Sequence, residues 1–442
     1  MIPSEGDKVM KKKKIFQNLL IGAGVFLTCV LAGFLLICMV YMLPSGRVSL
    51  HVQESGAILE QEKDYPQLIP SSPYMVLDNF TDCIMLLTSA YDGKESIADK
   101  AINNYRIYQK KATKQVSCKV CGILPEKDAQ KISYARYWHG YMVVLKPLLL
   151  FLNIHEIRQL NQFGILGCIC LIGILLYMNR KMKYLIPFLL AVSFLNPGVI
   201  MNSLQNSTIF YVSSLAVIVL LACWKRTGFR QYAWLYFMIT GMVTSYMDFL
   251  TYPVVALAFP LIFYYMLNED SRFIVTLKRL VGYSVMWCIG YAGMWSSKWV
   301  LSSILTGKNY FTNAMESITI RSGNVVGEQT ITLSDVYGML ITYLKDSKLW
   351  TCTLLFVVLC LVTLVLSSRR WKCWSVSLAF LIISLYPFVW GIGTKNHTYI
   401  HHMFTHRGWS VLIFGLSCAV LPMIERPFEV IRKKVFHLDK RK

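Results

Sequence analysis

The sequence predicts an all-α integral membrane protein with about ten membrane-spanning helices and a large first outer loop. Of its 442 residues, 55% are hydrophobic and only 16% are charged, and the mean hydropathy is +0.46. The charges gather between long apolar runs. A water-soluble chain of this length could not bury so much apolar surface, whereas a bilayer solvates the runs and water solvates the links.

The first apolar run covers residues 15–43 and follows the basic stretch Lys11–Lys14. It is longer than the ~7–15-residue core of a signal peptide, and no small-x-small cleavage site ends it. We therefore expect a cytoplasmic N-terminus at 1–14 and an uncleaved first helix over 15–43.

A polar stretch, residues 44–161, comes next and is predicted to be the large outer loop. It contains a shorter apolar segment, 141–152, which cannot cross a ~30 Å hydrocarbon core. Such a segment suits a helix lying in the membrane interface.

The remaining apolar runs predict a polytopic core over residues 162–424, with a second outer loop at 306–348 and a basic cytoplasmic tail at 425–442. The nine further helices are expected at 162–178, 184–200, 206–224, 233–249, 252–267, 280–304, 349–366, 375–392 and 408–424. Asn196-Pro197-Gly198 and Thr251-Tyr252-Pro253 are chain breakers placed where short outer turns are needed.

The charge distribution predicts the orientation. Lys and Arg recur in every predicted inner loop, whereas the turns 201–205 and 250–251 have none. The positive-inside rule then places both termini in the cytoplasm of a multi-pass cell-membrane protein. The net charge is +21, but the basic residues form no stripe interleaved with aromatics, so we expect membrane lipid and not nucleic acid as their partner.

Polar groups collect on the predicted outer side, and Asp78 and Asp82 are the first of them. Four residues apart, they would share one face of a helix. They could bind a divalent cation such as Mg²⁺ or Mn²⁺, or one could act as a general base while the other tunes its pKa. The alternative is a helix N-cap followed by a solvated helix face.

The segment Tyr134–Tyr141 is the second candidate and contains Arg136, Tyr137, Trp138 and His139. An Arg and a His among aromatic rings can hold a phosphate and stack on a sugar. An aromatic belt at the headgroup level is the alternative, although it does not account for Arg136 beside His139.

Asp248 is the third candidate, an acid at the outer end of an apolar stretch. A charge there is expensive without a partner or water, so the residue is a site candidate; the alternative is a salt bridge to an outer-loop Arg. Arg321, in the loop 306–348, lies in a segment that could cover the same cavity.

The fourth candidate is the histidine-rich segment Lys395–Arg407. Its ionisable members are Lys395, His397, His401, His402, His406 and Arg407. The i, i+4 spacing of the histidines permits zinc, but no carboxylate or cysteine accompanies them, so phosphate recognition is favoured over metal. Cys83, Cys118 and Cys121 in the first loop are compatible with a local disulfide, a redox pair or half of a zinc site, and the structural interpretation is favoured.

A long outer loop directly after the first helix, with acids in it and an aromatic amphipathic segment before the second helix, resembles the layout of GT-C-type membrane glycosyltransferases. The resemblance implies a polyprenyl-phosphate-linked sugar donor and a glycan, lipid or protein acceptor in the cell envelope. It also implies a first-loop catalytic acid, here Asp78 or Asp82, and phosphate contacts from Arg136, His139 and the segment Lys395–Arg407. The acids lie farther beyond the first helix than is usual in that superfamily, and the helices are fewer than in many members. This leaves open which Asp is the base.

Parts of the chain are also similar to uncharacterised polytopic membrane proteins of Gram-positive bacteria, namely Tyr134–Arg158 and the stretches around Asp248 and Asn396. Two other classes remain as alternatives: a secondary transporter or flippase, and a polymerase or ligase of lipid-linked glycans. A transporter would favour an internal repeat, which the sequence lacks, and a polymerase usually carries its largest outer loop late in the chain. Asn79, Asn206 and Asn396 begin Asn-x-Ser/Thr sequons on the predicted outer side.

Overall fold

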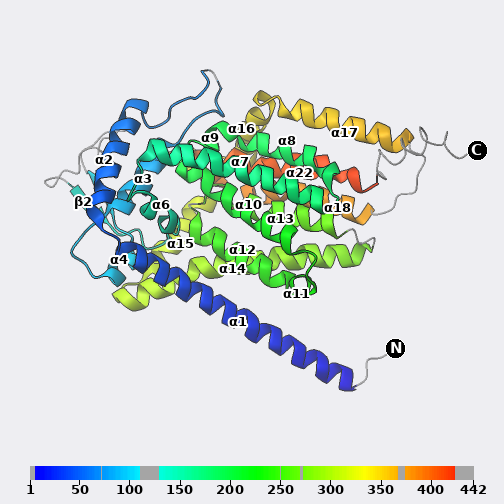
Figure 1. Cartoon of the computed structure of the whole chain (residues 1–442), viewed down its shortest axis with the longest axis horizontal. Helices are drawn as coiled ribbons and strands as arrows, with labels where there is room; N and C mark the ends of the chain where they lie inside the picture. The colour runs from blue at the N-terminus through cyan, green and yellow to red at the C-terminus, as the bar shows by residue number, and fades with distance from the viewer. Residues whose placement is uncertain are drawn as a thin grey trace, which may run out of the picture.

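Helices dominate the architecture, a bundle flanked at one end by short helices and loops (Figure 1). The structure is a computed structural model, and it describes residues 5–70, 72–109, 129–248, 250–268, 272–366 and 374–423. Cys118, Cys121 and the predicted tail 425–442 lie outside the described residues.

The N-terminal third supplies one long helix and several short elements. These are α1 (Glu5–Tyr41), α2 (Ser45–Glu62), α3 (Asn79–Ala90), α4 (Ile97–Asn103), β1 (Arg106–Gln109), β2 (Ala129–Ile132) and α6 (Met142–Leu148). Strands β1 and β2 pair in antiparallel fashion. The apolar runs of the sequence do not predict this hairpin, because neither short strand contains one.

The middle of the chain forms most of the bundle. Its helices are α7 (Ile154–Met178), α8 (Leu185–Leu195), α9 (Pro197–Ile200), α10 (Leu204–Cys223), α11 (Thr227–Gln231), α12 (Ala233–Met247), α13 (Val254–Leu267) and α14 (Phe273–Thr306). Asn196 and Pro253 lie between helices, and Pro197 is the first residue of α9, so the run predicted over 184–200 is divided after Leu195.

The last third adds a cover segment and further core helices. Its elements are α15 (Tyr310–Ser322), β3 (Val325–Val326), β4 (Gln329–Thr330), α16 (Leu333–Asp346), α17 (Leu349–Leu366), α18 (Trp374–Ser384), α19 (Tyr386–Gly393), α20 (Lys395–Ile400), α21 (His402–Thr405) and α22 (Ser410–Ala419). A break at Leu385 divides the helix predicted over 375–392 into α18 and α19, with Pro387 near the start of α19.

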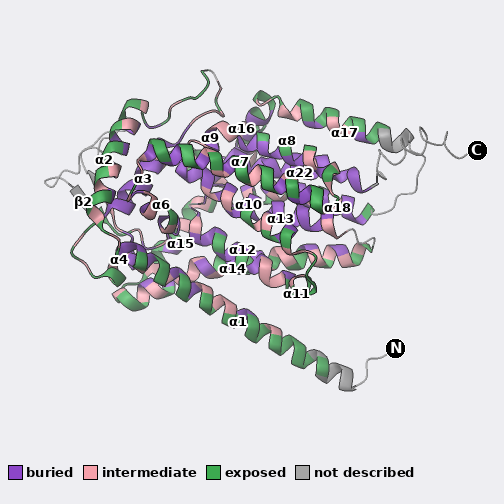
Figure 2. Cartoon of the chain, in the orientation of Figure 1, coloured by how far each residue is buried: buried purple, intermediate pink, exposed green. Residues whose placement is uncertain are grey.

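Five stretches of described helix are long and apolar enough to cross a membrane. They are Lys12–Tyr41, Ile154–Met178, Leu204–Cys223, Phe273–Thr306 and Trp374–Gly393. Three shorter apolar helical stretches accompany them: Met182–Leu195, Val254–Leu267 and Leu349–Val362. Large apolar side chains lie exposed along α1, α7 and α14, for example Leu27, Phe163 and Ile304 (Figure 2). Exposed apolar surface of this extent fits contact with lipid, and the fold is consistent with an all-α membrane protein.

Helices α12 and α14 pack closely against each other. A Cβ atom on Gly241 would lie 2.1 Å from the Trp287 carbonyl oxygen, and one on Gly290 would lie 2.0 Å from that of Met238. Only glycine permits such an approach of two backbones, which is a common device between membrane helices. The positions of the site residues are therefore given relative to α12 and α14.

One end of the bundle carries the polar elements and is called here the loop end. Helices α2, α3, α4 and α6 lie there (Figure 1), and α15 packs onto the adjoining end of α14 and onto α20. The loop end corresponds to the side that the sequence predicts to face outward.

Candidate functional site

Asp82 is buried in α3 and joins this helix to the start of α10. Its carboxylate accepts hydrogen bonds from the backbone N–H groups of Leu204 and Gln205, both at 3.0 Å, and from the Ser203 hydroxyl at 3.3 Å. An acid at the N-terminus of another helix satisfies amides that have no partner inside that helix. Burial nevertheless raises the pKa of Asp82 to about 7, while the nearby Arg158 opposes the shift.

Asp78 is the N-cap residue of α3. It accepts from the Thr81 N–H at 3.0 Å and from the Thr81 hydroxyl at 2.8 Å. Burial raises its pKa to about 6, against the lowering effects of the Thr81 contacts and of Arg407. Asp78 thus makes the N-cap contact of the structural alternative, whereas Asp82 is buried against α10 and does not lie on a solvated helix face. Asp78 accepts fewer hydrogen bonds than Asp82.

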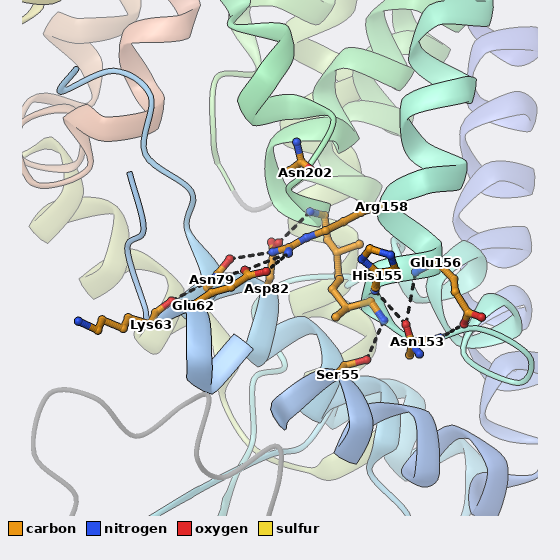
Figure 3. A network of polar contacts seen from close by, with 12 residues as sticks. Ser55, Glu62, Lys63, Asn79, Asp82, Asn153, His155, Glu156, Arg158 and Asn202 are labelled. Carbon is orange, nitrogen blue, oxygen red and sulfur yellow. Dashed lines mark hydrogen bonds and ion pairs between the residues drawn. The ribbon is translucent and has the colours of Figure 1, made fainter. Parts of the chain in front are cut away.

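Arg158 of α7 is the counter-charge of this region, as Figure 3 shows. Its guanidinium lies 2.8 Å from Glu62 of α2 and donates to Asn79 at 3.0 Å. It also acts electrostatically on Asp82. We call Glu62, Asp78, Asn79, Asp82 and Arg158 the acidic group. Glu62, Asn79 and Arg158 were not predicted as site residues; a charged residue beginning a long apolar helix was the signal for Arg158.

Arg407 links the acidic group to the turn after α12. It is fully buried and donates to the carbonyl oxygens of Leu195 at 3.1 Å and Met403 at 2.7 Å. Asp78 and Tyr252 both act on its charge, and burial lowers its pKa to about 10. Tyr252 in turn donates to the Asn206 carbonyl oxygen at the start of α10.

Arg136 and Tyr137 lie on the other side of the loop end, against α14. The Arg136 carbonyl oxygen accepts from the indole N–H groups of Trp295 at 2.8 Å and Trp299 at 3.2 Å. Tyr137 stacks on Trp295 with ring centroids 5.9 Å apart. The Arg136 guanidinium lies 5.6 Å from the Tyr137 ring centre and donates to Ser317 of α15 at 3.1 Å.

Arg321 of α15 approaches the same tyrosine, with its guanidinium 5.7 Å from the Tyr137 ring centre. Its Nη1 lies 3.1 Å from His397 Nδ1, and His397 Nε2 lies 2.6 Å from the Leu250 carbonyl oxygen. His401 stands beside His397, with ring centroids 4.7 Å apart. The structure therefore brings together predicted site residues from three distant segments. We call Arg136, Tyr137 and Arg321 the cationic cluster.

Asp248 ends α12 in a capped turn. It accepts from the Thr251 N–H at 3.0 Å and from the Thr251 hydroxyl. This turn presents Leu250 to His397 and Tyr252 to Asn206. The turn capped by Asp248 thus contacts residues on both sides, those near the acidic group and those near the cationic cluster.

The other predicted aromatic and histidine residues make internal contacts. Trp138 donates to the Met294 carbonyl oxygen at 2.6 Å. Both ring nitrogens of buried His139 lie near protein oxygens, the Tyr141 hydroxyl at 3.3 Å and the Tyr134 carbonyl at 3.2 Å, and burial lowers its pKa to about 3.

In the histidine-rich segment, His402 Nδ1 lies 2.6 Å from the Tyr343 hydroxyl, and His406 stacks on the same tyrosine. Lys395 is half-buried at the start of α20. Within the described residues, no three His, Cys, Asp or Glu side chains are grouped so that they could hold a metal ion. The geometry therefore gives the predicted metal alternative no support among these residues.

An apolar cavity of about 840 Å³ lies between α6, α7, α10 and α12. On α10 its lining runs from Leu204 to Val219, about 22 Å at 1.5 Å per residue. Val219 is 45% exposed and Val243 of α12 is 42% exposed, so the cavity opens sideways along the apolar surface. Sequence reasoning missed it, although small residues on facing helices (Gly164, Ser207 and Thr240) were a signal.

The cavity and the cationic cluster lie on opposite sides of α12. Ile239, Val243 and Met247 line the cavity, whereas Met238 and Gly241 contact α14. At 3.6 residues per turn these sets occupy opposite faces. The chain crosses the end of α12 at Gly140, whose N–H donates to the Tyr246 carbonyl oxygen at 2.8 Å.

The three sequon asparagines of the loop end are all buried. Asn79 contacts Arg158, Asn206 lies at the start of α10, and Asn396 donates to the Val325 carbonyl oxygen. None of them is exposed as a glycosylated asparagine would be.

Comparison of the chain with protein-family models, with curated proteins and with solved structures gave no match.

Proposed function

We propose that the protein is a membrane glycosyltransferase that takes a sugar from a polyprenyl-phosphate donor at the outer face of the cell membrane. The loop end faces outward in this proposal, both termini are cytoplasmic, and the apolar runs form about ten spans. The acceptor is a glycan, lipid or protein of the cell envelope.

One observation carries the proposal: the apolar cavity begins next to the acidic group. Met85, three residues after Asp82, and Leu204, whose N–H donates to Asp82, both line the cavity. The cavity volume lies within the range of small-molecule sites, and its lining accepts a hydrocarbon chain. A lipid chain placed there brings its head group to the layer that holds buried carboxylates and guanidinium groups.

Asp78 is the better base of the two aspartates. Asp82 already accepts three hydrogen bonds that fasten α3 to α10, whereas the two hydrogen bonds that Asp78 accepts within the described residues both come from Thr81. A carboxylate with a pKa near 6 is deprotonated at neutral pH and basic enough to take a proton in a transition state.

The reaction we propose is a direct displacement. Asp78 removes the proton of an acceptor hydroxyl, whose oxygen attacks the anomeric carbon of the donor sugar. The bond from that carbon to the phosphate oxygen breaks, and the phosphate leaves with the electron pair. Arg158 and Arg407, the guanidinium groups that act on Asp82 and Asp78, stabilise the charge that grows on the phosphate. No metal ion is required by this scheme.

The test is transfer by the purified protein in nanodiscs, using a panel of undecaprenyl-phosphate hexoses and following loss of the lipid-linked sugar. Val243→Trp should fill the cavity and lower transfer at least tenfold. Val285→Trp is the matched control, because Val285 is 48% exposed on α14 and does not line the cavity. If Val243→Trp turns over as fast as the wild type, the cavity is not the donor site.

A lipid flippase is the second candidate, and the sideways opening of the cavity favours it. Fluorescent undecaprenyl phosphate in proteoliposomes discriminates the two functions. Translocation without any loss of sugar would replace the transferase proposal with the flippase.

A further inference from the structure

We infer that the cationic cluster binds the phosphate group of a second substrate, distinct from the lipid that occupies the apolar cavity. The inference rests on the proposed function, in which two substrates meet at the loop end, and it identifies a phosphate-bearing acceptor.

The first argument is charge. Two guanidinium groups lie near the ring of Tyr137, at 5.6 and 5.7 Å from its centre. Among the described residues, the ion pairs join Lys100, Lys131 and Arg158 to carboxylates, and neither guanidinium of the cluster is included. The Arg136 Nε atom is buried without a hydrogen-bond acceptor. Two neighbouring positive charges with an unused donor are completed by an anion.

The second argument is the way Arg321 is held. A carbonyl oxygen only accepts, so His397 Nε2 must donate to Leu250, and in the neutral ring Nδ1 is then free to accept from Arg321. Burial keeps the pKa of His397 well below its ordinary value, which favours this neutral form. His397 is therefore a positioning residue that aims Arg321 without neutralising it.

The third argument is separation. Cluster and cavity lie on opposite faces of α12, and an α-helix is about 10 Å across. Gly140 fills the crossing point, with the Tyr246 carbonyl directly beneath it. A donor phosphate leaving the cavity beside Met85 and Leu204 meets the acidic group first, whereas Arg136 and Arg321 are approached from α15, which they contact or belong to.

The chemistry of the cluster selects a phosphate. Planar guanidinium groups form paired hydrogen bonds to phosphate oxygens, and two of them match the charge of a dianion. Beside them, half-buried Trp295 stacks on the buried Tyr137 ring and is the aromatic side chain of the pair against which a sugar ring can lie. A soluble sugar phosphate and a phospholipid head group share this chemistry.

The experiment is calorimetric titration of the purified protein with inorganic pyrophosphate, in neutral detergent and in nanodiscs. Arg136→Gln and Arg321→Gln should each weaken binding at least tenfold, and His397→Ala should weaken it several-fold by releasing Arg321. Lys308→Gln is the matched control, because Lys308 is exposed just ahead of α15. Circular dichroism melting identifies any variant that fails to fold, and an unfolded variant is replaced by the Lys substitution at the same position. Binding by both Arg variants at wild-type strength would overturn the site.

Competition then separates the two ligands. Undecaprenyl phosphate at a saturating concentration should leave the pyrophosphate affinity unchanged. The binding of undecaprenyl phosphate itself must be lost in Val243→Trp. A loss of pyrophosphate binding in proportion to lipid occupancy would show that the donor phosphate occupies the cluster, and would overturn the inference. Weaker binding in phosphatidylglycerol nanodiscs than in phosphatidylcholine nanodiscs supports the site and identifies a lipid head group as the source of the phosphate. Absence of sugar transfer with pyrophosphate binding intact would reject the proposed function and leave the site standing.

Discussion

The acidic group and the cationic cluster lie at the same end of the bundle but satisfy their charges in opposite ways. In the acidic group, Asp82 caps α10, Asp78 caps α3, and Arg158 pairs with Glu62. In the cationic cluster, Arg136 and Arg321 meet aromatic rings and neutral acceptors. Buried charges of the acidic group thus stabilise the fold through their partners, whereas Arg136 and Arg321 pair with no carboxylate among the described residues and are the groups for which we propose an anionic ligand.

The largest effect is expected at Asp78, which accepts two hydrogen bonds where Asp82 accepts three. Asp78→Asn should lower transfer about 10²–10⁴-fold, the contribution of a general base, and should leave the protein folded. In the wild type the rate should rise with pH through about 6, because burial raises the pKa of Asp78 to that value and the base acts deprotonated. Asp92→Asn, at an exposed position of the same loop, is the control. Transfer at the wild-type rate in Asp78→Asn would return this residue to a purely structural role.

The next effect contrasts the two sets of arginines in stability. Arg158→Met should lower the free energy of unfolding by about 2–3 kcal/mol, less than the full cost of breaking a buried pair because Glu62 is 33% exposed. Arg136→Met should cost less than about 1 kcal/mol, since its acceptors on α15 are neutral. Denaturant melts of the two variants side by side measure the difference. Equal losses would remove the distinction between the two regions.

A smaller effect is expected at Gly140, where the chain crosses the end of α12. A Cβ atom on Gly140 would lie 2.5 Å from the Tyr246 carbonyl oxygen and closer still to its ring. Gly140→Ala should therefore destabilise the protein by about 1–3 kcal/mol, the usual cost of overpacking. Gly24→Ala in α1 meets nothing within 4 Å and should be neutral or slightly stabilising. A Gly140→Ala protein as stable as the wild type would mean that Tyr246 can move to accommodate the added methyl group.

The last effect is a pH dependence of stability. The pKa of Asp82 is raised in the folded state from an ordinary value of 3.8 to about 7, so the folded state binds more protons between these values. The contribution of this group is full below about pH 4 and is lost as the pH rises through about 7. Asp82→Asn should show a shallower fall in melting temperature between pH 5 and pH 8 than the wild type. Parallel slopes in the two proteins would contradict the burial argument.

Much of the helical layout follows from hydropathy alone. Each predicted apolar run overlaps helical structure, and the breakers Asn196 and Pro253 lie between helices, while Pro197 begins α9. The structure describes five helical stretches long enough to span a membrane, so the count of ten stays a prediction. Hydropathy identifies an apolar helix from the residues of that helix alone, so no knowledge of tertiary contacts is needed.

The candidate site depends on contacts that are not local. The N-cap of Asp78 involves a residue three positions away and was foreseeable, whereas Asp82 caps a helix more than a hundred residues later. The pairing of Arg321 with His397 and the apolar cavity depend equally on tertiary packing. Sequence could nominate Arg136, Arg321 and His397 by residue type, but not their convergence on one tyrosine.

The burial of Asn79, Asn206 and Asn396 bears on how the protein can be produced. In a eukaryotic host, oligosaccharide added to any of these sequons during synthesis would have to enter the packed interior of the loop end. A glycan on the purified chain would therefore mark a misfolded fraction, and a bacterial host avoids the problem. Removing the sequons by Asn→Gln is no remedy at Asn79, because the longer side chain would displace the contact with Arg158.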